Sequence, residues 1–219
     1  MKMPLPFILP QTVLAFVLTF SGLVMLSGCS VVSPSGAQSG SAAQSAEVVM
    51  SGDYILNEDG TLRKPHVTPS VPTMDKAALQ FNEIGAAQAA YQFVELVEYA
   101  WTTGDTQPLR DFSEERCTFC QSTIEQIQTL YEQGGWVNGM RLTVTEKTLN
   151  APIDESTPKG SEYANSYAVS QVVETSEFDF FASGRLNHNP AARNTMELFI
   201  HWIGSDWKVA AGRILDESE

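Results

Sequence analysis

The hydrophobic pattern of this chain changes its period at Gly134-Gly135, and this change constrains the fold more than any other feature. Before it, apolar residues recur every three or four positions over 89–105 and again after Ser113, as in amphipathic helices. After it, apolar and polar residues alternate, which is typical of strands with one buried face. Helices followed by antiparallel strands predict an α+β domain rather than a doubly wound parallel one.

The boundaries of these elements follow from capping and turn residues. We expect Gly104 to end the first long helix and Ser113 to cap the next one. The expected strands are 140–149, 166–175, 178–184, 195–203 and 207–215, paired as an antiparallel meander. The folded domain is therefore predicted to cover 76–219.

The first residues have the features of an export signal. Lys2 precedes an apolar stretch over 14–26, and Leu26-Ser27-Gly28-Cys29 follows it, a pattern that resembles a bacterial lipobox. An uncleaved membrane helix is the competing interpretation. The lipobox predicts a signal peptide over 1–28 and a diacylglyceryl group on Cys29. Two acyl chains anchor a protein stably, which predicts a lipid-anchored lipoprotein on the extracytoplasmic face of the cell membrane.

Residues 29–75 are predicted to form a flexible tether between the lipidated cysteine and the domain. The stretch up to 47 is rich in Ser, Gly, Ala and Gln, and prolines follow it. A small hairpin is expected around Asp59-Gly60. As a random coil the tether would span roughly 35–40 Å.

The charge balance bears on partners. With 26 acidic and 13 basic residues, the net charge is −13, which opposes binding to phosphate backbones and excludes nucleic acid as an expected partner. The sequence contains no nucleophile elbow, zincin motif, phosphate-binding loop or dinucleotide fingerprint. We therefore assign no catalytic residue, no cofactor and no metal site.

Cys117 and Cys120 allow three interpretations. A redox pair normally follows a buried strand, and a zinc site needs two further ligands, for which the sequence offers no histidine pair at ligand spacing. Residues three apart at a helical turn can be bridged, and disulfides persist outside the cytoplasm. The pair is thus interpreted as a structural disulfide, with a redox-active pair as the alternative.

Four residues are candidates for a pocket. On the strand 195–203, Glu197 and His201 share one face with an aromatic residue, and a carboxylate beside a histidine can act in acid–base chemistry. Asp179 lies between two phenylalanines, and Trp202 could line a ligand site. Ordinary packing and solvent-facing positions are the favoured explanation for all four residues, and a pocket is the alternative.

Several short elements, taken in order, give the chain a family resemblance. They are Gly85-Ala86, Tyr99-Ala100, Thr103-Gly104-Asp105, Leu109, the pair Cys117 and Cys120, Gly134-Gly135 and Gly139. With the lipobox and the tether, they resemble an uncharacterised lipoprotein family of actinobacteria known as domain of unknown function 6318. That resemblance implies helices packed on a curved antiparallel sheet, in the cone-shaped layout of nuclear transport factor 2. It implies no reaction.

The expected function is non-catalytic binding or scaffolding in the cell envelope. The partners would be the membrane, through the diacylglyceryl-cysteine, and an unknown envelope protein or small ligand. Two alternatives remain open. One is a small-molecule enzyme of the isomerase or dehydratase kind that uses a cone pocket, and the other is a thiol-disulfide oxidoreductase that uses Cys117 and Cys120.

Overall fold

A computed structural model of the chain describes residues 49–154, 156 and 162–215. The predicted signal peptide, Cys29 and the first part of the predicted tether lie outside these residues. The described residues belong to one compact unit that begins at Val49. No helix within them is long and apolar enough to cross a membrane.

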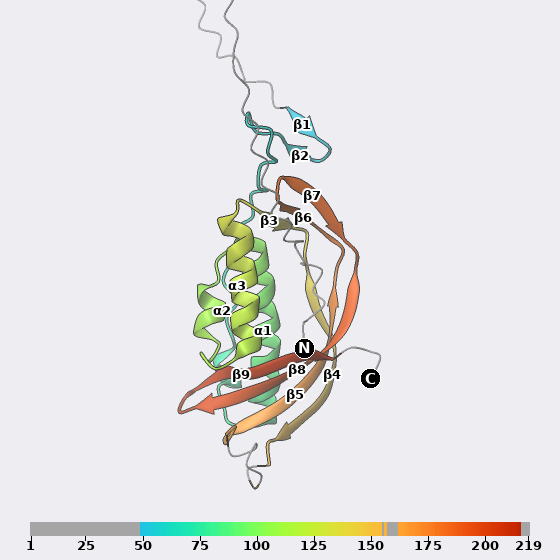
Figure 1. The fold of residues 1–219 in the computed structure, drawn as a ribbon. Coiled ribbons are helices and arrows are strands. Elements are labelled where there is room, and N and C mark those ends of the chain that lie inside the picture. The colour runs from blue at the N-terminus through green and yellow to red at the C-terminus, as the bar shows by residue number, and fades with distance from the viewer. Residues whose placement is uncertain (1–48, 155, 157–161, 216–219) are drawn as a thin grey trace, which may run out of the picture. The chain divides into compact units, whose positions relative to one another are not determined.

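The helices precede the two larger sheets in the chain (Figure 1). They are the short 3-10 helix η1 (Lys76–Ala78), followed by α1 (Glu83–Thr103), α2 (Gln107–Asp111) and α3 (Thr118–Glu132). At the start of α1, the Asn82 side chain accepts a hydrogen bond of 2.8 Å from the Gly85 amide. The helix ends at Gly104, as the sequence predicted, with the left-handed φ of 84° that favours glycine.

The start of α3 differs from the expectation. Ser113 does not cap it, because its hydroxyl donates to the Leu109 carbonyl at 2.7 Å and so closes the short helix α2. The N-cap is Cys117, whose Sγ accepts from the Cys120 amide at 3.2 Å. Pro108 in the first turn of α2 favours this extra helix, which the hydrophobic pattern alone did not reveal. The helix α3 ends just before Gly134-Gly135, as expected.

The strands form three antiparallel sheets. Their bounds are β1 (Met50–Ser51), β2 (Tyr54–Ile55), β3 (Trp136–Asn138), β4 (Leu142–Pro152), β5 (Ser166–Thr175), β6 (Phe178–Ala182), β7 (Arg185–Asn189), β8 (Ala192–Ile203) and β9 (Asp206–Leu215). The sheet orders are β1-β2, β3-β6-β7 and β4-β5-β8-β9. Helices and antiparallel sheets confirm the α+β class. The connectivity is not the simple meander that was expected, because the β6–β7 hairpin pairs with β3 and leaves β5 to pair with β8.

One face of the four-stranded sheet is covered by α1 and α3 (Figure 1). On β8, Leu198 and Ile200 point to this face and are fully buried. Beside them on β5, the Gln171 side chain donates to the Ala90 carbonyl of α1 at 3.1 Å. The alternate residues of β8, including Glu197 and Phe199, therefore lie on the opposite face. This face is only partly covered, since both residues are partly exposed.

Residues 49–75, which the sequence assigned to the tether, lie in the compact unit. The Tyr54 ring packs 5.0 Å from that of Trp136, whose indole nitrogen donates to the Leu62 carbonyl at 3.3 Å. Leu56 and Leu62 are bridged across the turn that was predicted around Asp59-Gly60. These aromatic contacts explain the difference, because they join residues more than 70 positions apart and leave no periodic signal in the segment itself.

We expect Gly104→Ala to lower the free energy of unfolding by more than Gly134→Ala. Both glycines have positive φ, 84° and 75°, which costs another residue about 1–2 kcal/mol. A Cβ at position 104 would also lie 2.4 Å from the Tyr131 ring, whereas position 134 has nothing within 4 Å. Urea unfolding of the two variants measures the difference. Equal losses would contradict the close approach of Tyr131 to Gly104.

Candidate functional site

A groove of about 880 Å³ crosses the face of the four-stranded sheet opposite α1. Its floor is a row of residues paired across four strands, which are Ala151, Ala168, Phe199 and Ala211. Alanine side chains leave room above the strands, while the Phe199 ring stands between them. The floor is therefore apolar, hollow and partly accessible to solvent.

The wall of the groove comes from the segment that precedes β5. The ring of Tyr163 meets that of Phe199 edge to face, with centroids 4.9 Å apart. The Arg116 guanidinium lies over the Tyr163 ring, 4.9 Å from its centroid. It also donates to the Glu162 carbonyl at 2.8 Å. One arginine from the turn before α3 thus holds this wall in place.

That turn reaches the sheet because it pairs with the edge strand β9. The Glu114 amide donates to the Val209 carbonyl at 2.9 Å, and the Val209 amide donates to the Phe112 carbonyl at 3.0 Å. The Glu114 carboxylate then contacts Arg116 at 2.6 Å and His201 Nδ1 at 2.5 Å. Burial alone would raise the pKa of Glu114, but the hydrogen bonds with His201 and Arg116 lower it below its usual range. Glu114 is therefore an ionised carboxylate that supports the turn.

The two candidate residues on β8 lie on the groove face but have different partners. Glu197 lines the groove, and its Oε2 contacts the Arg213 guanidinium of β9 at 2.5 Å. His201, farther along the strand, contacts Glu114 rather than Glu197. The structure does not bring Glu197 and His201 together as an acid–base pair, because the Phe199 ring lies between them and each is held by another element.

Asp179 and Trp202 lie outside the groove lining. Asp179 is on β6 of the three-stranded sheet, where it accepts a hydrogen bond of 2.7 Å from the Tyr54 hydroxyl and lies 3.0 Å from His188 Nδ1. These hydrogen bonds, first from Tyr54 and then from His188, lower the pKa of its carboxyl group. Trp202 packs against Trp207, with ring centroids 4.9 Å apart. Asp179 thus supports the docking of Tyr54, and Trp202 is a packing residue.

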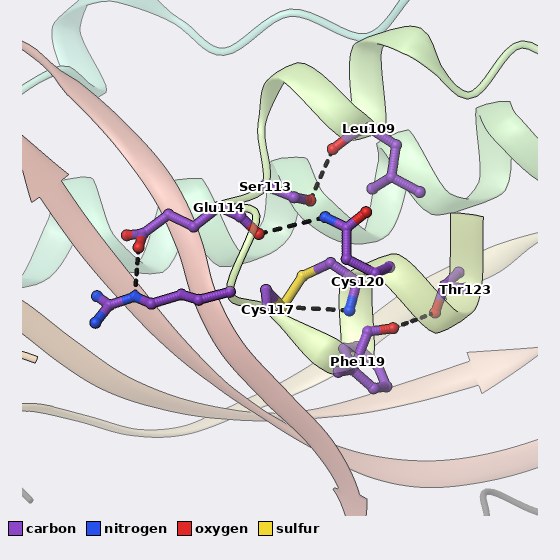
Figure 2. Close-up of a disulfide and its surroundings, with 9 residues drawn as sticks. Leu109, Ser113, Glu114, Cys117, Phe119, Cys120 and Thr123 are labelled. Atoms are coloured by element: carbon purple, nitrogen blue, oxygen red, sulfur yellow. Dashed lines mark hydrogen bonds and ion pairs between the residues drawn. A yellow bond between two sulfur atoms is a disulfide. The ribbon is translucent and has the colours of Figure 1, made fainter. Parts of the chain in front are cut away.

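The two cysteines of the turn are joined by a disulfide (Figure 2). Both are fully buried, and their Cα atoms lie 5.2 Å apart. Thiol-disulfide exchange requires a thiolate to reach one of the sulfur atoms, and burial opposes this. Within residues 49–154, 156 and 162–215, no three His, Cys, Asp or Glu side chains are placed to hold a metal ion.

Sequence reasoning missed four residues of the site, which are Glu114, Arg116, Tyr163 and Arg213. Alternation along β9 could have placed Arg213 on the open face, since it lies two residues from Ala211. The other three lie outside the α3 helix and the β strands, where neither helical nor strand periodicity gives a signal. Only the fold brings them to the groove.

The comparisons with known proteins concern the family and the fold. Residues 57–211 match a family of unknown function, DUF6318. No curated protein matches the sequence. Among solved structures, the intermembrane-space region of the chloroplast protein ARC6 is 14% identical, with a TM-score of 0.43 over 67% of this chain and 100% of its own.

Two further structures show weaker similarity. An uncharacterised protein with a cystatin-like fold from Caulobacter vibrioides is 12% identical, with a TM-score of 0.38 over 61% of this chain and 92% of its own. A variant of the protein designated Rd1NTF2_05 is 10% identical, with a TM-score of 0.32 over 57% of this chain and 96% of its own.

We expect the Cys117–Cys120 disulfide to resist reduction in the folded protein. After treatment with dithiothreitol and iodoacetamide, peptide mapping should show alkylation of these cysteines in urea but not under native conditions, because both are buried. Cys117→Ala combined with Cys120→Ala should lower the free energy of unfolding by about 2 kcal/mol, the entropy expected of so short a loop. Rapid alkylation of the native protein would contradict a structural role and favour a redox-active pair.

Proposed function

The chain belongs to the family of unknown function DUF6318, and we propose that it is a lipid-anchored envelope protein whose α+β domain binds a partner in the groove. It would be a lipoprotein of the actinobacterial type, held on the extracytoplasmic face of the cell membrane. The groove over Phe199 carries the proposal for binding. The sequence before residue 49 carries the proposal for the anchor.

The anchor rests on the order of sequence features at the N-terminus. The apolar stretch 14–26 ends at Leu26-Ser27-Gly28-Cys29, and polar and small residues follow at once. Cleavage before Cys29 would remove the apolar stretch, and a diacylglyceryl group on its thiol would hold the mature protein at the membrane. Residues 30–48 would then form the tether, which is shorter than the sequence alone predicted because the compact unit begins at Val49.

Binding rather than catalysis is favoured by how the charged groups near the groove are engaged. Glu197 is paired with Arg213, and Glu114 is paired with both Arg116 and His201. A general acid or base must exchange its proton with a substrate, and these contacts instead tie both carboxylates to residues of the chain itself. The buried disulfide likewise supports a scaffold more than an oxidoreductase. An apolar floor with paired charges at its edge suits recognition.

We expect Cys29→Ser to abolish attachment of the lipid. In bacteria that process lipoproteins, the unchanged chain should incorporate alkyne-tagged palmitate and sediment with membranes, because the thiol of Cys29 is the only group that the lipid transfer can use. The variant should lose the label. Ser30→Ala is the matched control and should keep it. Unchanged labelling of the Cys29 variant would overturn the proposed anchor.

We expect the groove to contact a partner in cells. A photo-crosslinking benzoylphenylalanine in place of Ala151, at the groove edge, should give a covalent adduct on irradiation. The same residue in place of Glu125, exposed on α3, should not, since that position is far from the groove face. Filling the floor with Ala168→Trp should abolish the adduct. Equal adducts from the two positions would show that the groove is not the binding site.

A further inference from the structure

We propose that the groove binds an extended peptide segment in which an apolar side chain lies beside lysine or arginine. This inference rests on the proposed binding function and adds the chemistry of the partner. Three properties of the described residues support it. They are the state of the charges around the groove, the aromatic residues of its floor and wall, and its length across the sheet.

The positive charge of each guanidinium group beside the groove is already paired with a glutamate carboxylate of the chain. Arg213 contacts Oε2 of Glu197 with two nitrogens, at 2.5 and 2.6 Å. Arg116 contacts Glu114 and the Glu162 carbonyl, and it stacks on Tyr163. Neither arginine therefore presents an uncompensated positive charge to an anionic partner.

Carboxylate groups at the groove, in contrast, remain able to accept a cation. Glu197 Oε1 has no partner among the described contacts, and its side chain is 31% exposed. Glu162 lines the groove and is exposed, and its carboxylate forms no ion pair with any residue that the structure describes. Asp154, also in the lining, adds a further negative charge. With a net charge of −13 on the chain, the potential at the groove favours a cation and opposes an anion.

The aromatic residues add a place for the cation and for its apolar neighbour. One face of the Tyr163 ring already carries the guanidinium of Arg116, so this wall shows the stacking geometry within the chain itself. The Phe199 ring is only half-buried and stands beside Ala168 and Ala211. A lysine or arginine stem can lie along this ring while an adjacent apolar side chain occupies the space above the alanines.

The length of the floor favours a peptide segment over a compact small molecule. Four neighbouring strands contribute to it, and their spacing makes the row about 14 Å long. An extended segment of about four residues spans the same distance. Because the groove lies open on the sheet surface, a small molecule would leave much of its own surface in water, unlike the ligands of enclosed pockets.

The test is calorimetric titration of the full chain, purified in a non-ionic detergent, with three capped pentapeptides. Their sequences are Leu-Lys-Phe-Lys-Leu and the versions in which both lysines are replaced by glutamine or by glutamate. We expect the lysine peptide to bind about tenfold more tightly than the glutamine peptide, as two exposed ion pairs allow. The glutamate peptide should not bind measurably. Raising the salt concentration should weaken the binding of the lysine peptide and leave the binding of the glutamine peptide unchanged.

Variants locate the effect in the groove. Glu162→Gln combined with Glu197→Gln should remove the preference for lysine over glutamine, whereas Glu125→Gln, an exposed change on α3, should keep it. If the lysine and glutamine peptides bind equally, or if Glu125→Gln has the same effect as the groove variants, this inference is overturned, and binding in the groove is decided by the crosslinking from Ala151. If no peptide binds, this inference is overturned, and the proposed function is then decided by the crosslinking from Ala151.

Discussion

The close approach of α3 to β9 at Gly212 determines the positions of the other parts of the site. A Cβ at this position would lie 2.6 Å from the Phe119 ring and 2.9 Å from Leu198, so only glycine lets the helix reach the sheet. Phe119 lies in the first turn of α3, between the two bridged cysteines (Figure 2). The disulfide therefore braces the turn at the point where the helix contacts the sheet. The same turn carries Arg116, which holds the groove wall through Tyr163 on the opposite face.

This arrangement gives the two faces of one sheet different tasks. Leu198 and Ile200 fill the space beneath α1 and are fully buried, so they stabilise the fold and are not available to a ligand. Phe199, between them in sequence, faces the groove. The groove lies on the face of the sheet opposite the helices, so a ligand there would contact neither Leu198 nor Ile200. Binding can therefore vary through the exposed residues without a change in the core.

The class of fold could be predicted because it depends on periodicity and on glycines. The change of period at Gly134-Gly135 and the stop at Gly104 are local features, and both appear in the structure. The β6–β7 hairpin and the docking of Tyr54 could not be predicted in the same way. Strand β3 is only three residues long, and its partner β6 lies some 40 residues later, so the sheet depends on long-range contacts.

In the candidate site as well, the sequence predicted on which face of the sheet a residue lies but not which residues it contacts. Alternation along β8 placed Glu197 and His201 on one face, but it could not reveal which charges they meet. The partner of His201 is Glu114, which lies in the turn that pairs with β9. The partner of Glu197 is Arg213, which lies opposite it on β9, and the pairing of β8 with β9 shifts its register between Phe199 and Ile200. A carboxylate that looks free in the sequence is thus paired in the fold. The charge that remains available for binding is set by these pairings, and for this reason a groove with two arginines nearby still favours a cationic partner.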